Sequence, residues 1–257
     1  MKTVRTIQEL RLALPAGRVG LVPTMGAFHD GHLALMRAAR AECDVVVVSL
    51  FVNPAQFGAH EDLAAYPRDE ERDARVAAEA GVDILFVPSA QAMYPEGFAT
   101  WVDIEETGGE AGARPGHFRG VATVCLKLFN IVRPTVAFFG QKDAQQVAVL
   151  RRMISDLNLG VGLRVLPTVR DADGLALSSR NAYLSADERE QALALPRALE
   201  VGRSASEPVA AARAALNGLE PEYVELLRLG DATLLTAAAQ IGSTRLIDNI
   251  VLEGELA

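Results

Sequence analysis

The chain has few cysteines, no long apolar run and no excess of positive charge, and each absence excludes a class of protein. Cys43 and Cys125 lie in apolar surroundings without metal-type spacing, which favours reduced core residues of a cytoplasmic protein. The start of the chain has no signal-peptide pattern, and no apolar run approaches the ~20 residues of a membrane helix. The formal net charge of −8 argues against nucleic acid and anionic membranes as partners, but not against an anionic small substrate.

What the chain does contain, over its first two thirds, is an alternation of strand-like and helix-like segments. Apolar β-branched runs predict strands, and apolar residues spaced three or four apart predict helices. The expected strands are 19–22, 44–52, 82–87, 100–104, 135–139 and 163–169, and the expected helices are 31–42, 70–80, 118–132 and 144–157. This order indicates α/β structure with a mostly parallel sheet, covered by helices on both faces.

The pattern changes after Asn181. We expect helices at 186–203 and 209–216, a strand at 223–227, a helix near 232–238 and a last strand at 244–251. A domain boundary near residue 170 follows, with a domain over 1–170 and a small α+β domain over 171–257. No internal repeat or low-complexity tract interrupts either part.

The segment Pro23–His32, with the sequence PTMGAFHDGH, is the strongest functional signal. It lies where an expected strand gives way to an expected helix, and helix N-termini favour anions. Gly26 and Gly31 allow close approach of the backbone, and His29 and His32 add donors that can become cationic near neutral pH. The alternative is a helix start capped by Asp30 with two surface histidines. We favour a phosphate site, because two of the four histidines of the chain lie in this loop.

Polar residues also follow the other expected strands, which is where ligands bind in open parallel sheets. They are Asn53 and Gln56; Gly140, Gln141, Lys142, Asp143, Gln145 and Gln146; Arg170; and Ser178, Ser179, Arg180 and Asn181.

These residue types suit a nucleoside triphosphate and a small polar substrate. Lys142 supplies a point charge for phosphate, and Asp143 can accept from a ribose hydroxyl. The Ser-Ser-Arg run at 178–180 offers hydroxyls and a guanidinium for the β- and γ-phosphates. Gln56 and Gln146 suit the hydroxyls and carboxylate of a small substrate. Each signal alone is also typical of an ordinary turn or cap, so their coincidence at strand ends carries the prediction.

Three further residues have competing explanations. Arg114 is a second basic candidate in a Gly- and Pro-rich loop, and we expect His117 in that loop to be hydrogen-bonded to backbone rather than to a ligand. Asp73 lies near a helix start with Glu70 and Glu71, where a solvated acidic first turn is the favoured explanation. Binding of Mg²⁺ by Asp73 is the alternative.

Five motifs occur in order along the chain: PTMGAFHDGH at 23–32, FVNPAQFG at 51–58, RPGHFRGV at 114–121, FGQKDAQQ at 139–146 and SSRN at 178–181. Together they closely resemble the pantothenate synthetase (pantoate–β-alanine ligase) family. The first and last resemble the HIGH and KMSKS elements of the wider nucleotidylyltransferase group. The chain departs from the family pattern at Gln141, where glutamate is expected, and at Leu177, where methionine is common.

The resemblance implies a Rossmann-like N-terminal domain, a smaller C-terminal lid domain and a cytoplasmic homodimer. It implies ATP-dependent joining of pantoate to β-alanine through an enzyme-bound pantoyl adenylate, with Mg²⁺–ATP as substrate and AMP and pyrophosphate as products. The implied ATP-binding residues are Met25, Gly26, Ala27, Phe28, His29, Asp30, Gly31, His32, Gly140, Gln141, Lys142, Asp143, Val169, Leu177, Ser178, Ser179 and Arg180. The implied catalytic residues are His32, His29, Lys142 and Arg180, and the implied substrate-binding residues are Gln56 and Gln146, with Asn53 close by.

Two other functions fit part of the pattern. One is a nucleotidyltransferase that keeps the nucleotide on its product, and the other is a nucleotide-sensing module without turnover. An aminoacyl-tRNA synthetase is disfavoured because the chain is acidic and has no room for an anticodon domain. The sequence leaves open whether His29 serves ATP or pantoate, and it offers no convincing general base for the β-alanine amine.

Overall fold

The computed structural model describes residues 1–59, 61–106, 108–216 and 218–255, and the chain divides into two compact units. The first unit comprises Met1–Glu106, Arg114–Phe139 and Val149–Arg164. The second comprises Thr107–Ala113, Gly140–Ala148 and Val165–Ala257. Within the described residues, none of the helices is both long and apolar enough to span a membrane.

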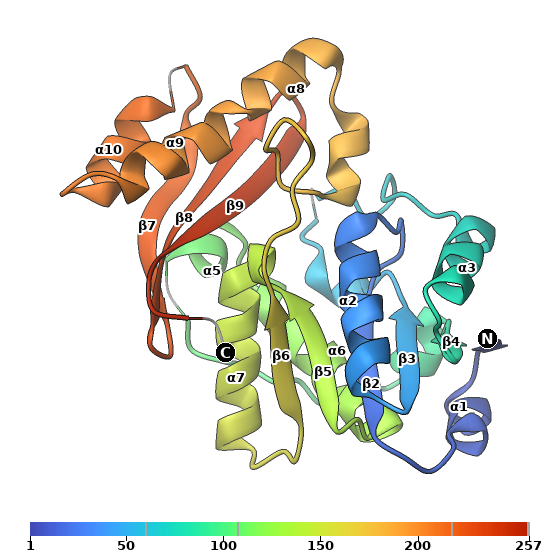
Figure 1. Cartoon of the computed structure of the whole chain (residues 1–257). Coiled ribbons are helices and arrows are strands. Elements are labelled where there is room, and N and C mark those ends of the chain that lie inside the picture. Colours follow the sequence, from blue (N-terminus) through green and yellow to red (C-terminus); the bar gives the residue numbers. More distant parts are fainter. Residues whose placement is uncertain (60, 107, 217, 256–257) are drawn as a thin grey trace. The chain divides into compact units, whose positions relative to one another are not determined.

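A six-stranded sheet is the framework of the first unit (Figure 1). Its strands, in spatial order, are β1 (Lys2–Val4), β4 (Ile84–Phe86), β3 (Val45–Leu50), β2 (Val19–Thr24), β5 (Val136–Gly140) and β6 (Gly162–Leu166). β2 pairs in parallel with β3 and β5, and β4 pairs in parallel with β1 and β3. The run Val45–Val48 is buried throughout, as expected for a strand covered on both faces of a parallel sheet. The prediction of an α/β fold with a parallel sheet is therefore confirmed.

Helices cover both faces of this sheet. The helices of the first unit are α1 (Ile7–Ala13), α2 (Asp30–Glu42), α3 (Glu70–Glu79), α4 (Ala90–Met93) and α6 (His117–Val132), with a 3₁₀ turn η1 (Pro54–Gln56). α2 packs on one face against β2 and β3, and α6 lies behind the sheet in Figure 1. Eleven of the sixteen residues of α6 are buried, so this helix supplies much of the core on its face.

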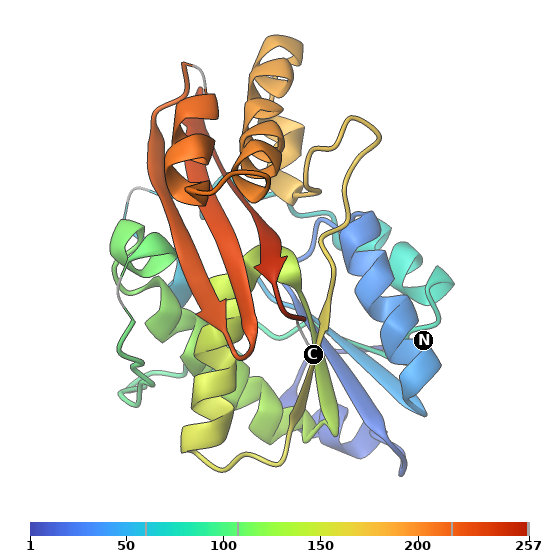
Figure 2. The same ribbon diagram turned by 60° about the vertical axis from the view of Figure 1, so that its left-hand side comes forward.

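The second unit is built around an antiparallel sheet, coloured orange to red in Figure 2. Its elements are α5 (Gly109–Ala113), η2 (Gln141–Asp143), η3 (Ser179–Tyr183), α8 (Ala186–Ala192), α9 (Ala194–Arg203), α10 (Pro208–Ala215), β7 (Pro221–Leu229), β8 (Ala232–Ile241) and β9 (Thr244–Glu253). α9 and α10 pack on one face of β7–β8–β9, with Leu195, Leu199 and Leu235 in the core between them. α7 (Ala144–Asp156) begins in this unit and ends in the first.

Three predicted elements are wrong. Residues 100–104 form no strand, and the Val102 N–H donates to Thr123 Oγ1 (3.0 Å) instead of to a neighbouring strand. Residues 232–238 belong to β8, not to a helix, because pairing with strands on both sides outweighs the helix propensity of an alanine-rich run. The helix expected over 186–203 is two helices. Pro196, third residue of α9, has no N–H to continue α8.

Candidate active site

The turn after β2 is strained at Ala27, and the carboxylate of Asp73 makes the two shortest side-chain bonds to it. Gly26 (φ 87°) and the non-glycine residue Ala27 (φ 52°) both have left-handed backbone, which is disfavoured for residues with a side chain. The Ala27 N–H donates to Asp73 Oδ2 (2.7 Å) and the Phe28 N–H donates to Asp73 Oδ1 (2.8 Å). Charge-assisted bonds of this kind are stronger than neutral ones, so Asp73 stabilises the strained turn.

Asp73 lies on α3 with only 1% of its surface exposed. The expected solvated acidic first turn is therefore wrong for this residue, because tertiary contacts bury it. A Cβ added to Gly26 would lie 2.9 Å from Asp73 Oδ2, so the turn and the carboxylate fit closely. Both oxygens of Asp73 already accept from backbone, and no group of three or more His, Cys, Asp or Glu among the described residues could hold a metal.

The two histidines form a reciprocal cap at the start of α2. His29, not Asp30, is the N-cap residue, and its Nδ1 accepts from the Gly31 N–H (3.2 Å). The His29 N–H in turn donates to Nδ1 of His32 (3.3 Å), and the two ring centroids are 4.2 Å apart. Because Nδ1 accepts in both rings, we assign the neutral tautomer with its proton on Nε2 to each. The start of the helix thus holds both imidazoles beside its backbone N–H groups, a setting suited to an anion.

The turn after β3 is organised by Asn53, which is 1% exposed. Its Nδ2 donates to Gln56 Oε1 (2.9 Å) and to the Gly120 carbonyl (3.1 Å), and its Oδ1 accepts from the Tyr94 hydroxyl (2.8 Å). Burial raises the pKa of Tyr94 to about 12, which keeps the hydroxyl protonated as a donor. Since Oε1 of Gln56 is occupied, the amide is fixed with Nε2 as the group for a ligand acceptor.

Gly120 on α6 permits this arrangement by close backbone packing. A Cβ at Gly120 would lie 2.1 Å from the Ala55 carbonyl oxygen and 2.8 Å from the Gln56 nitrogen. Backbone atoms cannot move aside as a flexible side chain does, so only glycine fits against η1.

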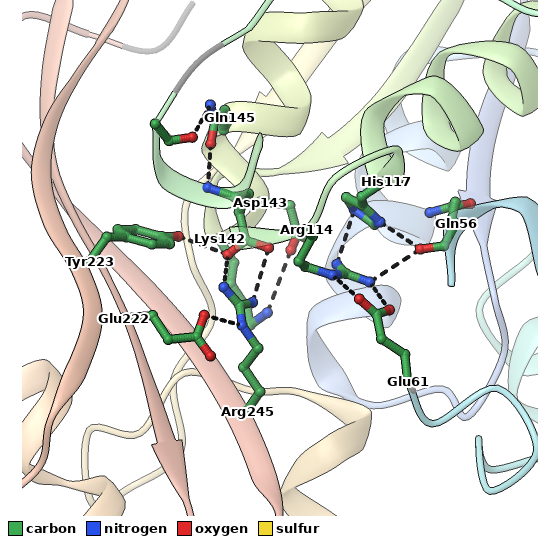
Figure 3. A network of polar contacts seen from close by, with 12 residues as sticks. Gln56, Glu61, Arg114, His117, Lys142, Asp143, Gln145, Glu222, Tyr223 and Arg245 are labelled. Atoms are coloured by element: carbon green, nitrogen blue, oxygen red, sulfur yellow. Dashed lines mark hydrogen bonds and ion pairs between the residues drawn. The ribbon is translucent and has the colours of Figure 1, made fainter. Parts of the chain in front are cut away.

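A cluster of Glu61, Arg114 and His117 holds the backbone carbonyl of Gln56 (Figure 3). His117 Nδ1 donates to it (2.9 Å), and Arg114 Nη2 donates over 3.3 Å. The expectation that His117 bonds to backbone is confirmed. Arg114 is bidentate to Glu61 (2.8 and 2.5 Å). Burial of Glu61 opposes its charge, but the hydrogen bonds and charge of Arg114 outweigh burial, so the pKa of Glu61 is lowered.

In the second unit, the turn that carries Lys142 is held by the C-terminal sheet. Asn249 on β9 donates through Nδ2 to the carbonyls of Gln141 and Lys142 (both 2.9 Å). Lys142 Nζ lies 3.5 Å from Asp143 Oδ1, and the Lys142 side chain retains 20% of its exposure. The turn is fixed while the Lys142 side chain stays partly exposed.

The residues predicted at 169 and 177–180 lie together in a short hairpin. The Leu177 N–H donates to the Val169 carbonyl (3.0 Å), and Ser178 caps η3 by accepting from the Arg180 N–H (3.2 Å). Arg170 forms a bidentate ion pair with Asp248 (2.6 and 3.0 Å). Gln146, the last predicted substrate residue, is half-buried on α7.

Gln145, one of the polar residues expected after a strand, and Glu110, which no sequence pattern predicted, also support the second unit. Gln145, next to Gln146, is buried and accepts from the Glu110 N–H (2.8 Å). Glu110 accepts from the Tyr223 hydroxyl (2.9 Å) and pairs with Arg245 (2.5 Å), which Figure 3 shows beside Glu222. Burial raises the pKa of Tyr223, so it remains a donor. No local motif marks this cluster, and none marks Asp248 and Asn249 inside an expected strand.

Together, the fold and these sites define an α/β enzyme with a Rossmann-like sheet. The family model described as pantoate-beta-alanine ligase matches residues 1–251. The pantothenate synthetase of Heliobacterium modesticaldum is 53% identical over 280 aligned positions, which cover 98% of this chain and 100% of the relative. That of Chloroflexus aurantiacus is 51% identical, covering 99% of each.

Solved structures agree with this assignment. The pantothenate synthetase of Thermus thermophilus matches with a TM-score of 0.95 and 46% identity, covering 99% of this chain and 100% of that one. The pantoate-beta-alanine ligase of Francisella tularensis, complexed with beta-gamma ATP and beta-alanine, matches with a TM-score of 0.86 and 35% identity, covering 99% of both. The chain belongs to the pantoate–β-alanine ligase family and is an enzyme of this type.

Proposed function

We propose that this enzyme joins pantoate to β-alanine through an enzyme-bound pantoyl adenylate, with ATP consumed and AMP and pyrophosphate released. Membership of the family over residues 1–251 carries the overall reaction. The relative solved with beta-gamma ATP and beta-alanine supports two of the three substrates. The reciprocal histidine cap, which holds both imidazoles at a helix N-terminus, supports an attack on phosphate.

In the first step, the pantoate carboxylate attacks the α-phosphorus in line, and pyrophosphate leaves. The protein must position two anions and balance the charge that develops on the phosphate oxygens. We assign this work to His29, His32, Lys142 and Arg180. The proposed ATP-binding segments are Met25–His32, Gly140–Asp143, Val169 and Leu177–Arg180.

In the second step, the amine of β-alanine, having lost a proton, attacks the acyl carbon, and AMP leaves. Gln56 holds pantoate through Nε2, Gln146 contributes a second amide, and Asn53 sets the orientation of Gln56. Mg²⁺ enters as the metal complex of ATP, where it neutralises phosphate charge. The oxygens of Asp73 are engaged with the turn, which favours a structural role for Asp73 over metal binding.

The adenylate is an activated acid prone to hydrolysis, so excluding water from it favours the enzyme. We propose that residues 1–170 form the ATP- and pantoate-binding domain and that residues 171–257 form a lid, which adds Leu177–Arg180 to the ATP-binding residues. We further propose a cytoplasmic homodimer, on the basis of the family resemblance. Sedimentation of the purified enzyme at micromolar concentration tests the dimer.

A product assay tests the function. The enzyme incubated with ATP, pantoate and β-alanine is expected to form AMP and pantothenate in equal amounts, and to form pantothenate only when β-alanine is present. ADP as product contradicts the proposal. Pyrophosphate without free AMP indicates a nucleotidyltransferase, and ATP binding without any product indicates a nucleotide sensor.

Substitutions in the turn residues test their assigned roles. His32→Ala and Lys142→Ala are each expected to slow adenylate formation by at least ~10²-fold, since each removes a donor to the developing charge. Gln56→Ala is expected chiefly to raise the KM for pantoate. Pyrophosphate release with Lys2→Ala, on the exposed end of β1, provides the control. Rates near wild type in His32→Ala or Lys142→Ala would remove those residues from the mechanism.

A further inference from the structure

Asn249 on β9 holds the Lys142 turn through three hydrogen bonds. Its Nδ2 donates to the carbonyl oxygens of Gln141 and Lys142, each over 2.9 Å. Its Oδ1 accepts from Gln141 Nε2 (3.1 Å). Asn249 is 2% exposed, so these contacts are shielded from water and each lost bond carries a desolvation cost.

The three bonds determine which way the Asn249 amide faces. Both N–H donors of Nδ2 have carbonyl acceptors, and the oxygen has a donor, so turning the amide over would oppose like groups at all three contacts. Gln141 completes the set because its amide has an N–H to give. A glutamate at that position, as the family pattern suggested, has no N–H for Asn249 Oδ1.

The neighbouring residue Asp248 fixes a second segment in the same unit. Its carboxylate receives both arms of the Arg170 guanidinium (2.6 and 3.0 Å) and also accepts from the Asn249 N–H (2.8 Å). Arg170 begins the hairpin that leads to Ser178 and Arg180. Two adjacent buried residues of one strand thus hold both of the proposed phosphate-binding segments of the second unit.

We propose that Asn249 is a positioning residue for ATP binding, acting through the backbone of Gln141 and Lys142 to fix where the Lys142 ammonium group lies. The proposal rests on the proposed function in one respect, the role of Lys142 toward ATP. Asn249 itself is assigned no contact with substrate. If Asn249 has a purely structural role, its substitution lowers the stability of the fold. If it is a positioning residue, its substitution weakens the binding of ATP and leaves the binding of pantoate unchanged.

Asn249→Asp tests the proposal with almost no change of shape. It retains an oxygen for Gln141 but removes both donors and sets a carboxylate oxygen against two carbonyls. The Kd of Mg²⁺–ATP, measured by calorimetry without pantoate, and the KM for ATP are expected to rise at least ~10-fold, with the KM for pantoate changed less than ~2-fold. Gln240→Glu, the same chemical change at an exposed position of β8, is expected to leave all three constants unchanged.

Wild-type affinity for ATP in Asn249→Asp would overturn the proposal, and so would an equal rise in the KM for both substrates. If circular dichroism shows that this variant does not fold, Asn249→Ala removes the three side-chain bonds without burying a charge against the carbonyls, and it is expected to raise the Kd of ATP roughly 3-fold. No rise there also overturns the proposal. Absence of ligase activity in the wild type contradicts the proposed function alone, because the ATP-binding comparison still decides the role of Asn249. A wild type that binds no ATP overturns both.

Discussion

The turns after β2 and β3 follow neighbouring strands of one sheet but are anchored in opposite ways. The β2 turn, which carries the histidines, has its two shortest side-chain bonds with one residue, Asp73, and longer ones with Thr24 and Arg72. The β3 turn, which carries Gln56, is held by the Asn53 amide, the Tyr94 hydroxyl, close packing of Gly120 and the Arg114–His117 contacts.

The difference predicts how each turn responds to damage. The left-handed residue Ala27 stores strain that the Asp73 carboxylate offsets, so losing that carboxylate leaves only the longer bonds of Thr24 and Arg72 to hold the turn. The β3 turn has several neutral anchors, and losing one leaves the others in place. One substitution at Asp73 is therefore expected to disrupt the β2 turn strongly, while one substitution in the β3 turn is expected to have a smaller effect.

The largest effect is expected for Asp73→Ala. It leaves the N–H groups of Ala27 and Phe28 without their acceptor, which is expected to cost about 2–4 kcal/mol in the free energy of unfolding. Displacement of the histidines is expected to slow adenylate formation at least ~10²-fold. Urea denaturation and pyrophosphate release measure the two effects.

Glu71→Ala, an exposed position on the same helix, is the control and is expected to be near wild type. The variant also separates a turn anchor from a metal ligand. Excess Mg²⁺ is expected to restore nothing in Asp73→Ala, and the loss of stability is expected in metal-free buffer. Rescue by Mg²⁺ would instead favour metal binding by Asp73.

An intermediate effect is expected for Gly120→Ala. The added methyl would meet the Ala55 carbonyl at 2.1 Å, so η1 must shift, at a cost of about 1–3 kcal/mol in stability. Movement of Gln56 is expected to raise the KM for pantoate roughly 10-fold, with the Kd of ATP unchanged. Gly160→Ala, where an added methyl meets nothing within 4 Å, is the control. A pantoate KM equal to that of the control would show that the close packing is not needed.

The smallest effect is expected for Glu61→Gln, because His117 still holds the Gln56 carbonyl when the Arg114 ion pair is weakened. The pKa of Glu61 is lowered in the folded state, so its contribution to stability is present above the ordinary carboxyl pKa of about 4.3 and is lost as the pH falls through the lowered value.

The stability of wild type relative to Glu61→Gln, from urea denaturation, is therefore expected to stay constant between about pH 6 and 8 and to shrink below about pH 4. Glu96→Gln, at an exposed position, is expected to show no such trend. A difference that is constant at every pH would mean that the Glu61 charge contributes nothing to folding.

The sequence predicts the parallel sheet well because its signals are local. The buried run of β3 and the helical periods of α2 and α6 can be recognised without any partner. The predictions that fail are those where tertiary contacts decide the structure. Ala237–Ala239 have the propensity of a helix but pack as a strand between β7 and β9, and nothing near residues 100–104 reveals the bond from Val102 to Thr123. Two helix starts that the expectations omit do have local signals, the capping box of Thr6 and Glu9 at α1 and Pro196 at the start of α9.

In the candidate site, too, local signals are recognised from the sequence and tertiary contacts are not. Motifs identify the residues that would face ligands, including His32, Gln56 and Lys142. They do not identify the residues that hold those groups, because Asp73 acts across 46 positions and Asn249 across 108. A carboxylate beside other acids is expected to be solvated until the fold places two backbone N–H groups against it.

The reciprocal histidine cap also settles when two side chains lose their freedom. Each ring of His29 and His32 accepts from a backbone N–H through Nδ1, so rotating either ring away breaks a bond of the cap. The rings are therefore ordered by folding, before any ligand arrives. An anion that binds at this turn does not have to immobilise two rotamer-rich side chains, and that part of the entropy cost of binding is absent.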